Sequence, residues 1–242
     1  MELENSIALV TGANRGIGRR FVTELQSRGA AKIYAAARNP EDVDLPGVVP
    51  IRLDVTDDAS VTAAAAAAGD VTLLINNAGM STYAKLVDGA MPDIRQEMET
   101  NYFGTLRMVR AFAPVLAANG GGAVLNVLSV MAWMAYEHSN SYSASKAAAW
   151  ALTNGIRVEL ADQGTQVTGL AMASVDTDMM AGIDVDKTDP ALIARRALDG
   201  VRAGAFEVLA DAQTVAWKAR LGEDPALLYP QLVRRESARV PR

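Results

Sequence analysis

The sequence contains no cysteine and only one histidine, His138, in 242 residues. A chain without cysteine forms neither a disulfide nor a thiolate zinc site, and a single histidine excludes a histidine-rich metal site. We therefore predict no metal site, although residue counts alone leave open a magnesium ion held by carboxylates.

Positive charge is also scarce, since 23 Lys and Arg face 28 Asp and Glu and the net charge is -5. Such a chain has no electrostatic footprint for nucleic acid or for an anionic membrane surface. No apolar run approaches the roughly 18 residues of a membrane span, and Glu2 and Glu4 stand where a signal peptide would be basic. We expect a cytoplasmic protein whose partner is a small molecule, with no nucleic-acid or membrane partner.

Half of the residues are hydrophobic, and short apolar runs alternate with helical patterns along the whole chain. Strands are expected at 7–10, 32–37, 48–53, 71–75, 124–128, 167–172 and 206–209. This βα alternation predicts an α/β fold, a single-domain doubly wound parallel sheet of Rossmann type with helices on both faces. One domain is expected over 1–242, with a substrate flap and a helix within it at 178–200.

Three glycines follow the first expected strand in the pattern Thr-Gly-x3-Gly-x-Gly. Glycine lets the backbone turn tightly and approach a pyrophosphate, while the helix that follows directs its free N–H groups at the anion. A purely structural turn into a helix is the alternative. We predict a phosphate-binding turn formed by Gly12, Asn14, Arg15, Gly16, Ile17 and Gly18.

Arg38 ends the second expected strand, twenty positions after Gly18. In a dinucleotide-binding fold an acidic residue at this distance binds the ribose 2′-hydroxyl of NAD, whereas an arginine accommodates the 2′-phosphate of NADP. A guanidinium binds a phosphate in bidentate fashion, and a carboxylate repels it. The sign of the charge therefore predicts NADP(H), with Arg15 as a second cation.

Tyr142 and Lys146 are four residues apart on an expected helix, so they share one face. A nearby cation favours the phenolate and lowers the pKa of a phenol, which makes Tyr142 a candidate proton donor. Such a pair also arises by chance on many helices. Its context is informative, because Ser129 ends the fifth expected strand and Asn101 interrupts an expected helical segment at 94–116.

Four motifs occur in order: the glycine turn, Asn76-Asn77-Ala78-Gly79, Ser129, and Tyr142-x3-Lys146. From position 7 to about 177 the chain resembles the short-chain dehydrogenase/reductase family, in its NADP-preferring, carbonyl reductase-like branch. By this resemblance Tyr142 is the general acid and Lys146 lowers its pKa and holds the nicotinamide ribose. Ser129 orients the substrate oxygen, and Asn101 anchors a water that leads protons to Lys146.

The same resemblance assigns further cofactor contacts. It places Asp54 at the adenine and Thr177 at the nicotinamide carboxamide, and it adds Val55, Asn77, Ala78, Gly79 and Val175 to the cofactor-binding residues. The activity implied is reversible hydride transfer between NADPH and a ketone or aldehyde. The alternatives are an NAD-linked alcohol dehydrogenase and a non-catalytic protein that senses NADP.

The chain departs from the family pattern in two places. Met172-Ala173 replaces a frequent Pro-Gly after the sixth strand, and Ala210-Asp211-Ala212 replaces a frequent Asp-Gly-Gly after the last one. Pocket shape near the nicotinamide and the packing of the final segment therefore do not follow from the resemblance.

The expected substrate pocket is mostly apolar, which suits a hydrophobic or aromatic carbonyl compound, although the same residues also suit ordinary core. Its candidates are Met131, Trp133, Met134, His138, Met172, Ala173, Ser174 and Met179. His138 is expected to make surface contacts. The helices around 100–116 and 147–160 are apolar beyond one stripe, which predicts a homodimer or homotetramer.

Overall fold

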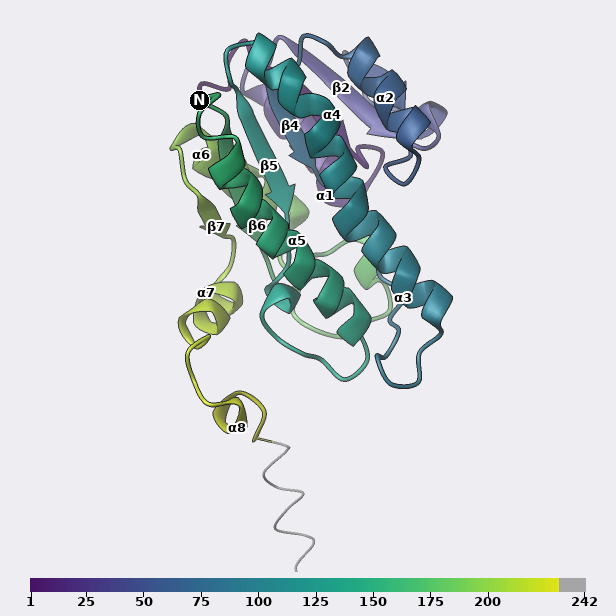
Figure 1. Ribbon diagram of the computed structural model, residues 1–242, viewed down its shortest axis with the longest axis vertical. Helices are drawn as coiled ribbons and strands as arrows, with labels where there is room; N and C mark the ends of the chain where they lie inside the picture. The colour runs from purple at the N-terminus through teal and green to yellow at the C-terminus, as the bar shows by residue number, and fades with distance from the viewer. Residues whose placement is uncertain (231–242) are drawn as a thin grey trace, which may run out of the picture.

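The computed structural model describes residues 1–230 of the chain, so the last twelve positions of the predicted domain, 231–242, lie outside the described residues. Seven parallel strands form one sheet in the order β3-β2-β1-β4-β5-β6-β7 (Figure 1). The strands are β1 Ile7–Thr11, β2 Lys32–Ala37, β3 Val49–Arg52, β4 Leu73–Asn76, β5 Ala123–Val127, β6 Gln166–Ala171 and β7 Glu207–Leu209. The predicted doubly wound parallel sheet is confirmed.

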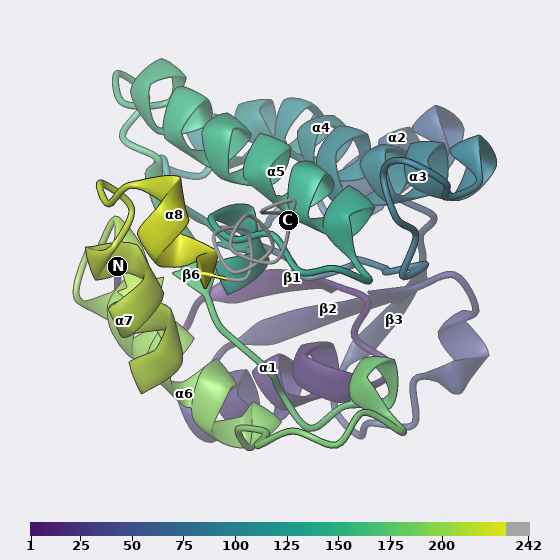
Figure 2. The ribbon, with the colours of Figure 1, turned by 90° about the horizontal axis from the view of Figure 1, so that it is seen from below.

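Helices cover both faces of the sheet. Figure 2 shows α2, α4 and α5 on one side and α1 and α6 on the other. Their bounds are α1 Gly16–Ser27, α2 Asp58–Ala67, α4 Thr105–Ala118, α5 Asn140–Glu159 and α6 Pro190–Arg202. The remaining elements are η1 Pro40–Asp42, α3 Met91–Met98, η2 Glu99–Gly104, η3 Val130–Ala132, η4 Asp178–Met180, α7 Ala212–Ala219 and α8 Pro225–Leu228.

The core consists of two hydrophobic layers, because alternate side chains of a strand point to opposite faces of the sheet. On β1, Ala8 and Val10 pack with residues of α1 and α6, whereas Leu9 packs with residues of α4 and α5. The central strands are buried on both faces, which explains why their sequences read as continuous apolar runs. The largest fully buried members include Phe21 and Phe112.

The sheet reverses its winding between β1 and β4. β1 pairs with β2 on one side and with β4 on the other, so the connections leave these two neighbours in opposite directions. In open α/β sheets a crevice opens at the carboxyl ends of the strands at such a switch point. The turns that follow β1 and β4 carry two of the sequence motifs there.

The helical segment expected at 94–116 is divided. α3 and α4 are joined by η2, a stretch of π-helix that contains Asn101. The Asn101 side-chain amide bonds to the backbone of Met80, accepting from its N–H and donating to its C=O, both at 2.9 Å. π-Helical turns inside α-helices frequently occur at functional sites.

The segment predicted as a flap and helix, 178–200, begins with η4 and continues into α6. A parallel bridge pairs Val175, which precedes η4, with Thr188, which precedes α6. The hydroxyl of Tyr83, a residue with a positive φ of 58°, hydrogen-bonds to the carbonyl of Met179. The loop after β4 therefore contacts the start of the predicted flap.

The C-terminal helices pack beside the loop after β5. The ammonium of Lys218 on α7 lies 4.3 Å from the ring centre of Trp133 and 5.0 Å from that of Trp150. The two indole rings meet edge to face at 6.3 Å. Among the described helices, none combines the length and the apolar character needed to cross a membrane.

Candidate active site

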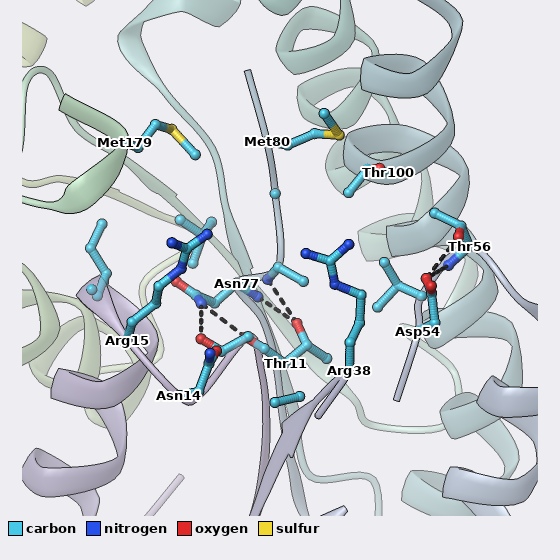
Figure 3. A pocket seen from close by; sticks show the side chains of 18 of the residues that line it. Thr11, Asn14, Arg15, Arg38, Asp54, Thr56, Asn77, Met80, Thr100 and Met179 are labelled. Carbon is cyan, nitrogen blue, oxygen red and sulfur yellow. Dashed lines mark hydrogen bonds between the residues drawn. The ribbon is translucent and has the colours of Figure 1, made fainter. Parts of the chain in front are cut away.

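A cavity of about 1160 Å³ opens at the carboxyl ends of the central strands (Figure 3). Sixteen of the residues predicted for the site line it: Gly12, Asn14, Arg15, Gly16, Ile17, Arg38, Asp54, Val55, Asn77, Ala78, Gly79, Tyr142, Lys146, Met172, Thr177 and Met179. They come from positions far apart in the sequence. The fold therefore gathers both the phosphate-turn motif and the Tyr-Lys motif around one space.

The glycine turn has the geometry of an anion cradle. Gly12 and Gly16 have φ values of 65° and 54°, in the left-handed region that favours glycine. A Cβ on Gly18 would lie 2.0 Å from the carbonyl oxygen of Gly12, so only glycine fits there. α1 starts without a side-chain cap or an acidic residue in its first turn, which leaves its N–H groups available to a phosphate.

Thr11 and Asn77 hold the cradle against the end of β4. The Thr11 hydroxyl accepts hydrogen bonds from the backbone N–H groups of Asn77 and Ala78, both at 2.9 Å. The Asn77 side-chain amide donates to the Thr11 carbonyl at 2.9 Å and to the Gly12 carbonyl at 3.2 Å. These bonds fix the backbone on two neighbouring strands where a ligand would lie.

Arg15 and Arg38 reach the cavity from the glycine turn and from the end of β2, and their side chains extend in the same direction (Figure 3). Arg15 lies 3.5 Å from Asp178, but both side chains are largely exposed, so this pair is weak. Arg38 is exposed and makes no ion pair within 1–230. Its guanidinium is therefore free to bind an anion.

Asp54 follows β3 and lines the cavity beyond Arg38. Burial acts to raise the pKa of Asp54, but hydrogen bonds from Thr56 and the charge of Arg38 together hold it below its ordinary value. The Thr56 N–H and hydroxyl donate to the same carboxylate oxygen at 2.9 and 2.7 Å. Asp54 is therefore an ionised, oriented acceptor at neutral pH.

Tyr142 lies in the first turns of α5, on the cavity wall. Burial raises the pKa of its phenol, and a hydrogen bond with Ser129 opposes that shift. The charge of Glu97 and the neighbouring Tyr83 add to the increase. The expected lowering of the Tyr142 pKa is therefore absent from the protein alone, because desolvation of the phenolate outweighs the effect of its polar neighbours.

Lys146 lies one turn after Tyr142, with its ammonium 5.6 Å from the centre of the phenol ring. The Lys146 ammonium donates to the carbonyl of Val127 at 3.0 Å. Burial lowers the pKa of Lys146 to about 8, because the charged form is desolvated. The lysine therefore stays mostly protonated at neutral pH but loses its charge readily above it.

Ser129 and Asn101 are not among the residues that line the cavity, although the Ser129 side chain hydrogen-bonds with the phenol of Tyr142, which does line it. Ser129 caps η3, and its hydroxyl oxygen accepts from the N–H of Met131 at 3.1 Å, which orients the side chain. Asn101 is buried and donates to Ser145 at 2.9 Å. Gly18 and Val175 also lie outside the lining, the first packed under the glycine turn and the second in the core.

The predicted substrate residues are divided between places. Met172 and Met179 line the main cavity. Met131, Trp133 and Met134 line a second cavity of about 330 Å³ on the other side of the loop after β5. His138 is exposed and lies edge to face with Tyr136, while Ala173 and Ser174 line neither cavity. Closeness to Tyr142 along the chain therefore does not bring the loop residues at 131–138 into the main cavity.

The cavity also contains residues that the sequence did not single out: Thr11, Ala37, Asn39, Asp42, Leu53, Thr56, Met80, Pro92, Arg95, Gln96, Glu99, Thr100, Val127, Leu128 and Asp178. Thr11 stood inside the glycine motif, so its position gave a signal. The residues of α3 and η2 gave none, because only the folded arrangement brings them to the cavity.

Known proteins match this chain over most of its length. A family profile described as short chain dehydrogenase covers residues 6–188. The chain belongs to the short chain dehydrogenase family. An uncharacterized oxidoreductase of Staphylococcus aureus strain MW2 is 34% identical over 212 residues, covering 81% of this chain and 90% of that protein.

Other members of the short chain dehydrogenase family differ in the cofactor that their names give. The NADPH-dependent 1-acyldihydroxyacetone phosphate reductase of Schizosaccharomyces pombe is 33% identical, covering 75% of this chain and 63% of that one. A Burkholderia cenocepacia short chain dehydrogenase structure in complex with NADP is 40% identical, with a TM-score of 0.91 and coverage of 96% and 99%. A Burkholderia phymatum family member in complex with NAD is 25% identical, with a TM-score of 0.81 and coverage of 89% and 92%.

Proposed function

We propose that this oxidoreductase is an NADPH-dependent reductase that converts a ketone or aldehyde to an alcohol, reversibly. The observation that carries the proposal is the meeting of Tyr142 and Lys146 with the glycine turn around one cavity, with Ser129 hydrogen-bonded to the phenol. A proton donor and a phosphate cradle in one space are what carbonyl reduction by a dinucleotide requires.

In this proposal NADPH supplies the hydride when bound, and the protein places the carbonyl and manages its proton. Tyr142 donates its proton to the carbonyl oxygen as negative charge develops there, and Ser129 donates a hydrogen bond to the same oxygen. Burial keeps the phenol protonated in the protein alone. The positive charge of Lys146 then favours loss of that proton during the reaction.

The choice of NADP(H) rests on charge at the turn and at the end of β2. Arg38 is exposed in the cavity without an acidic partner in 1–230, and Arg15 extends beside it. The Burkholderia cenocepacia and Schizosaccharomyces pombe relatives that bind or use this cofactor support the same assignment. The Burkholderia phymatum complex with NAD makes an NAD-linked dehydrogenase the second candidate, since fold alone does not separate the two.

The substrate proposed is a hydrophobic carbonyl compound, which the methionines that line the cavity would shield from water. Met172 is buried at 4% exposure, and Met80 and Met179 flank the opening (Figure 3). Methionine side chains adapt to apolar ligands of varied shape. A screen of NADPH consumption over aromatic, aliphatic and steroid-like ketones and aldehydes, with NADH in parallel, tests the activity and the substrate class together.

Replacing Tyr142 by Phe tests the proposed chemistry. The variant lacks the proton donor but keeps the ring, so we expect kcat to fall by about 1000-fold while NADPH binding stays near normal. Steady-state kinetics and NADPH fluorescence titration measure the two effects. Tyr136→Phe, an exposed tyrosine outside the cavity lining, is the matched control. Unchanged turnover in Tyr142→Phe rejects the assignment of the acid.

If the protein binds NADPH tightly but none of the carbonyl compounds in the screen causes NADPH to be oxidised, it would instead be a sensor of the NADP redox state. The cytoplasmic location and the homo-oligomeric state expected from the sequence stay predictions. The role of residues 178–200 as a substrate flap and helix also stays a prediction.

A further inference from the structure

Glu97 on α3 is a fully buried carboxylate that the proposed reaction does not use, at 0% exposure. One of its oxygens accepts from the backbone N–H of Thr82 at 2.5 Å and from the Thr82 hydroxyl at 2.8 Å. The other accepts a short hydrogen bond from the Ser141 hydroxyl. A buried charge is tolerated only when its hydrogen bonds are made, and all three partners here donate to it.

The Glu97–Ser141 contact is one of two parallel contacts between neighbouring helices. Glu97 and Asn101 are four residues apart on the α3 and η2 segment, and Ser141 and Ser145 are four residues apart on α5. Asn101 donates to Ser145 at 2.9 Å as Glu97 accepts from Ser141. Each serine directly precedes a residue of the proposed reaction. The two contacts therefore fix the rotation of α5 where it presents the phenol and the ammonium.

The loop after β4 is held by the same pair of helices. Asn101 binds both backbone groups of Met80, and Glu97 binds Thr82. The carbonyl of Ala84 lies 3.0 Å from the Ser141 hydroxyl oxygen and shares its one proton with Glu97. Glu97, like Asn101, contacts both this loop and α5, so it couples the cavity wall after Gly79 to the helix that carries the phenol.

We propose that Glu97 is a positioning residue, whose carboxylate acts through Ser141 and Thr82 to hold the start of α5 so that Tyr142 faces the cavity. This inference rests on the proposed function in taking Tyr142 as the proton donor. An apolar side chain at position 97 would leave the N–H and hydroxyl of the half-buried Thr82 without their acceptor. The donors of Thr82 and Ser141 need an acceptor, which explains why a carboxylate occupies this buried contact between helices.

The charge of Glu97 should affect the pH dependence of the reaction, which a residue that only fills space would leave unchanged. Ser129 opposes the raised pKa of Tyr142, Glu97 from α3 and Tyr83 from the loop after β4 add to it, and the Lys146 ammonium lies 5.6 Å from the ring centre. Burial is the largest cause of the raised pKa of Tyr142, and the negative charge of Glu97 raises it further. Neutralising it should lower that pKa and shift the alkaline limit of carbonyl reduction to lower pH.

Three variants separate geometry from charge. Glu97→Gln keeps a carbonyl oxygen for Thr82 and offers an amide donor to Ser141, whose hydroxyl still donates to the Ala84 carbonyl, so the contacts persist without the charge. Glu97→Ala removes both the contacts and the charge. Asp93→Asn is the matched control, because Asp93 carries the same charge one turn earlier on α3.

The full-length variants are compared by hydrogen exchange, NADPH titration, and kinetics with 4-nitrobenzaldehyde as the probe. We expect Glu97→Ala to speed exchange at 80–84 and 140–146 and to lower kcat about tenfold or more, with NADPH binding unchanged. Glu97→Gln should keep the exchange pattern of the parent protein and move the alkaline limit of the rate to lower pH. Asp93→Asn should change none of these.

Parent-like exchange and kcat in Glu97→Ala overturn the proposal. If that variant does not fold, Ser141→Ala removes the contact to α5 alone, and an unchanged kcat in it has the same meaning. If the parent protein reduces neither 4-nitrobenzaldehyde nor any carbonyl in the screen, the proposed function fails. The exchange data still decide whether Glu97 holds the start of α5.

Discussion

At the scale of single residues, burial moves the two titrating groups of the site toward their neutral forms. It raises the pKa of Tyr142 and lowers that of Lys146 to about 8. A proton donor needs its proton before the reaction, which the first shift secures. A cation near the donor helps that proton leave, and the second shift confines this help to pH values below or near 8. Opposite shifts in neighbouring groups are typical of acid–base sites.

Arg38 gives the sharpest prediction at this scale. Arg38→Asp replaces a charge-assisted contact with repulsion, so we expect NADPH binding to weaken by about 3 kcal/mol, roughly 100-fold, and NADH binding to change little. Dissociation constants for both nucleotides, measured side by side, give the ratio.

Arg52→Asp is the control for Arg38→Asp, because Arg52 pairs with Ala37 at the end of the next strand but does not line the cavity. The same change of charge there should leave the ratio of the two dissociation constants as in the parent. Equal losses for NADPH and NADH in Arg38→Asp would contradict the cofactor assignment.

At the scale of elements, the two departures from the family pattern meet. Asp211 caps α7, one oxygen accepting from the N–H of Thr214 at 2.8 Å, while its second oxygen accepts from the N–H of Ala173 at 2.8 Å. The segment after β6 and the segment after β7 are thus joined by one side chain. Met172, beside this junction, lines the cavity. A change in the last segment therefore bears directly on pocket shape.

Asp211→Ala should test that junction. The loss combines a helix cap, worth about 1 kcal/mol, with a backbone N–H left without its acceptor, so we expect about 2 kcal/mol of unfolding free energy to be lost. Urea denaturation measures it. Asp224→Ala removes the cap of α8 alone, where the carboxylate accepts from Ala226 at 2.7 Å, and should cost less. Equal losses would mean that the bond to Ala173 contributes nothing.

The sequence predicted the sheet because alternation of buried strands and capped helices is a local pattern. It likewise predicted the glycine turn, where a backbone constraint selects the residue type. It did not predict the bond from Asp211 to Ala173 or the buried Glu97, because a partner distant in sequence decides both. The sequence did contain one indication of Glu97, because this residue precedes Asn101 by one helical turn. The expected fall in the Tyr142 pKa was wrong for the protein alone because spacing says nothing of desolvation.

At the scale of the whole molecule, α4 and α5 lie side by side on one face of the sheet (Figures 1 and 2). Apolar side chains remain exposed on this layer, with Phe103 on η2 at 43% and Val158 on α5 at 78%. Large apolar side chains left exposed on a helix layer are candidates for a protein interface. They support the homo-oligomer expected from the sequence.

Val158→Glu should weaken that assembly, because an unpaired carboxylate in an apolar interface costs several kcal/mol. Sedimentation velocity of the parent should give a dimer or tetramer at micromolar concentration, and the variant should shift toward the monomer. Val215→Glu, on α7 at 49% exposure, is the control and should sediment like the parent. A parent protein that sediments as a monomer contradicts the prediction.

The packing of Lys218 against Trp133 and Trp150 has an optical consequence. The chain has three tryptophans, and the third, Trp217, is the neighbour of Lys218 on α7. All the indole fluorescence therefore originates where the C-terminal helices meet the loop that precedes the phenol. Undocking of α7 would change the emission of the whole molecule without touching the glycine turn, so the protein carries a built-in fluorescent reporter of that junction.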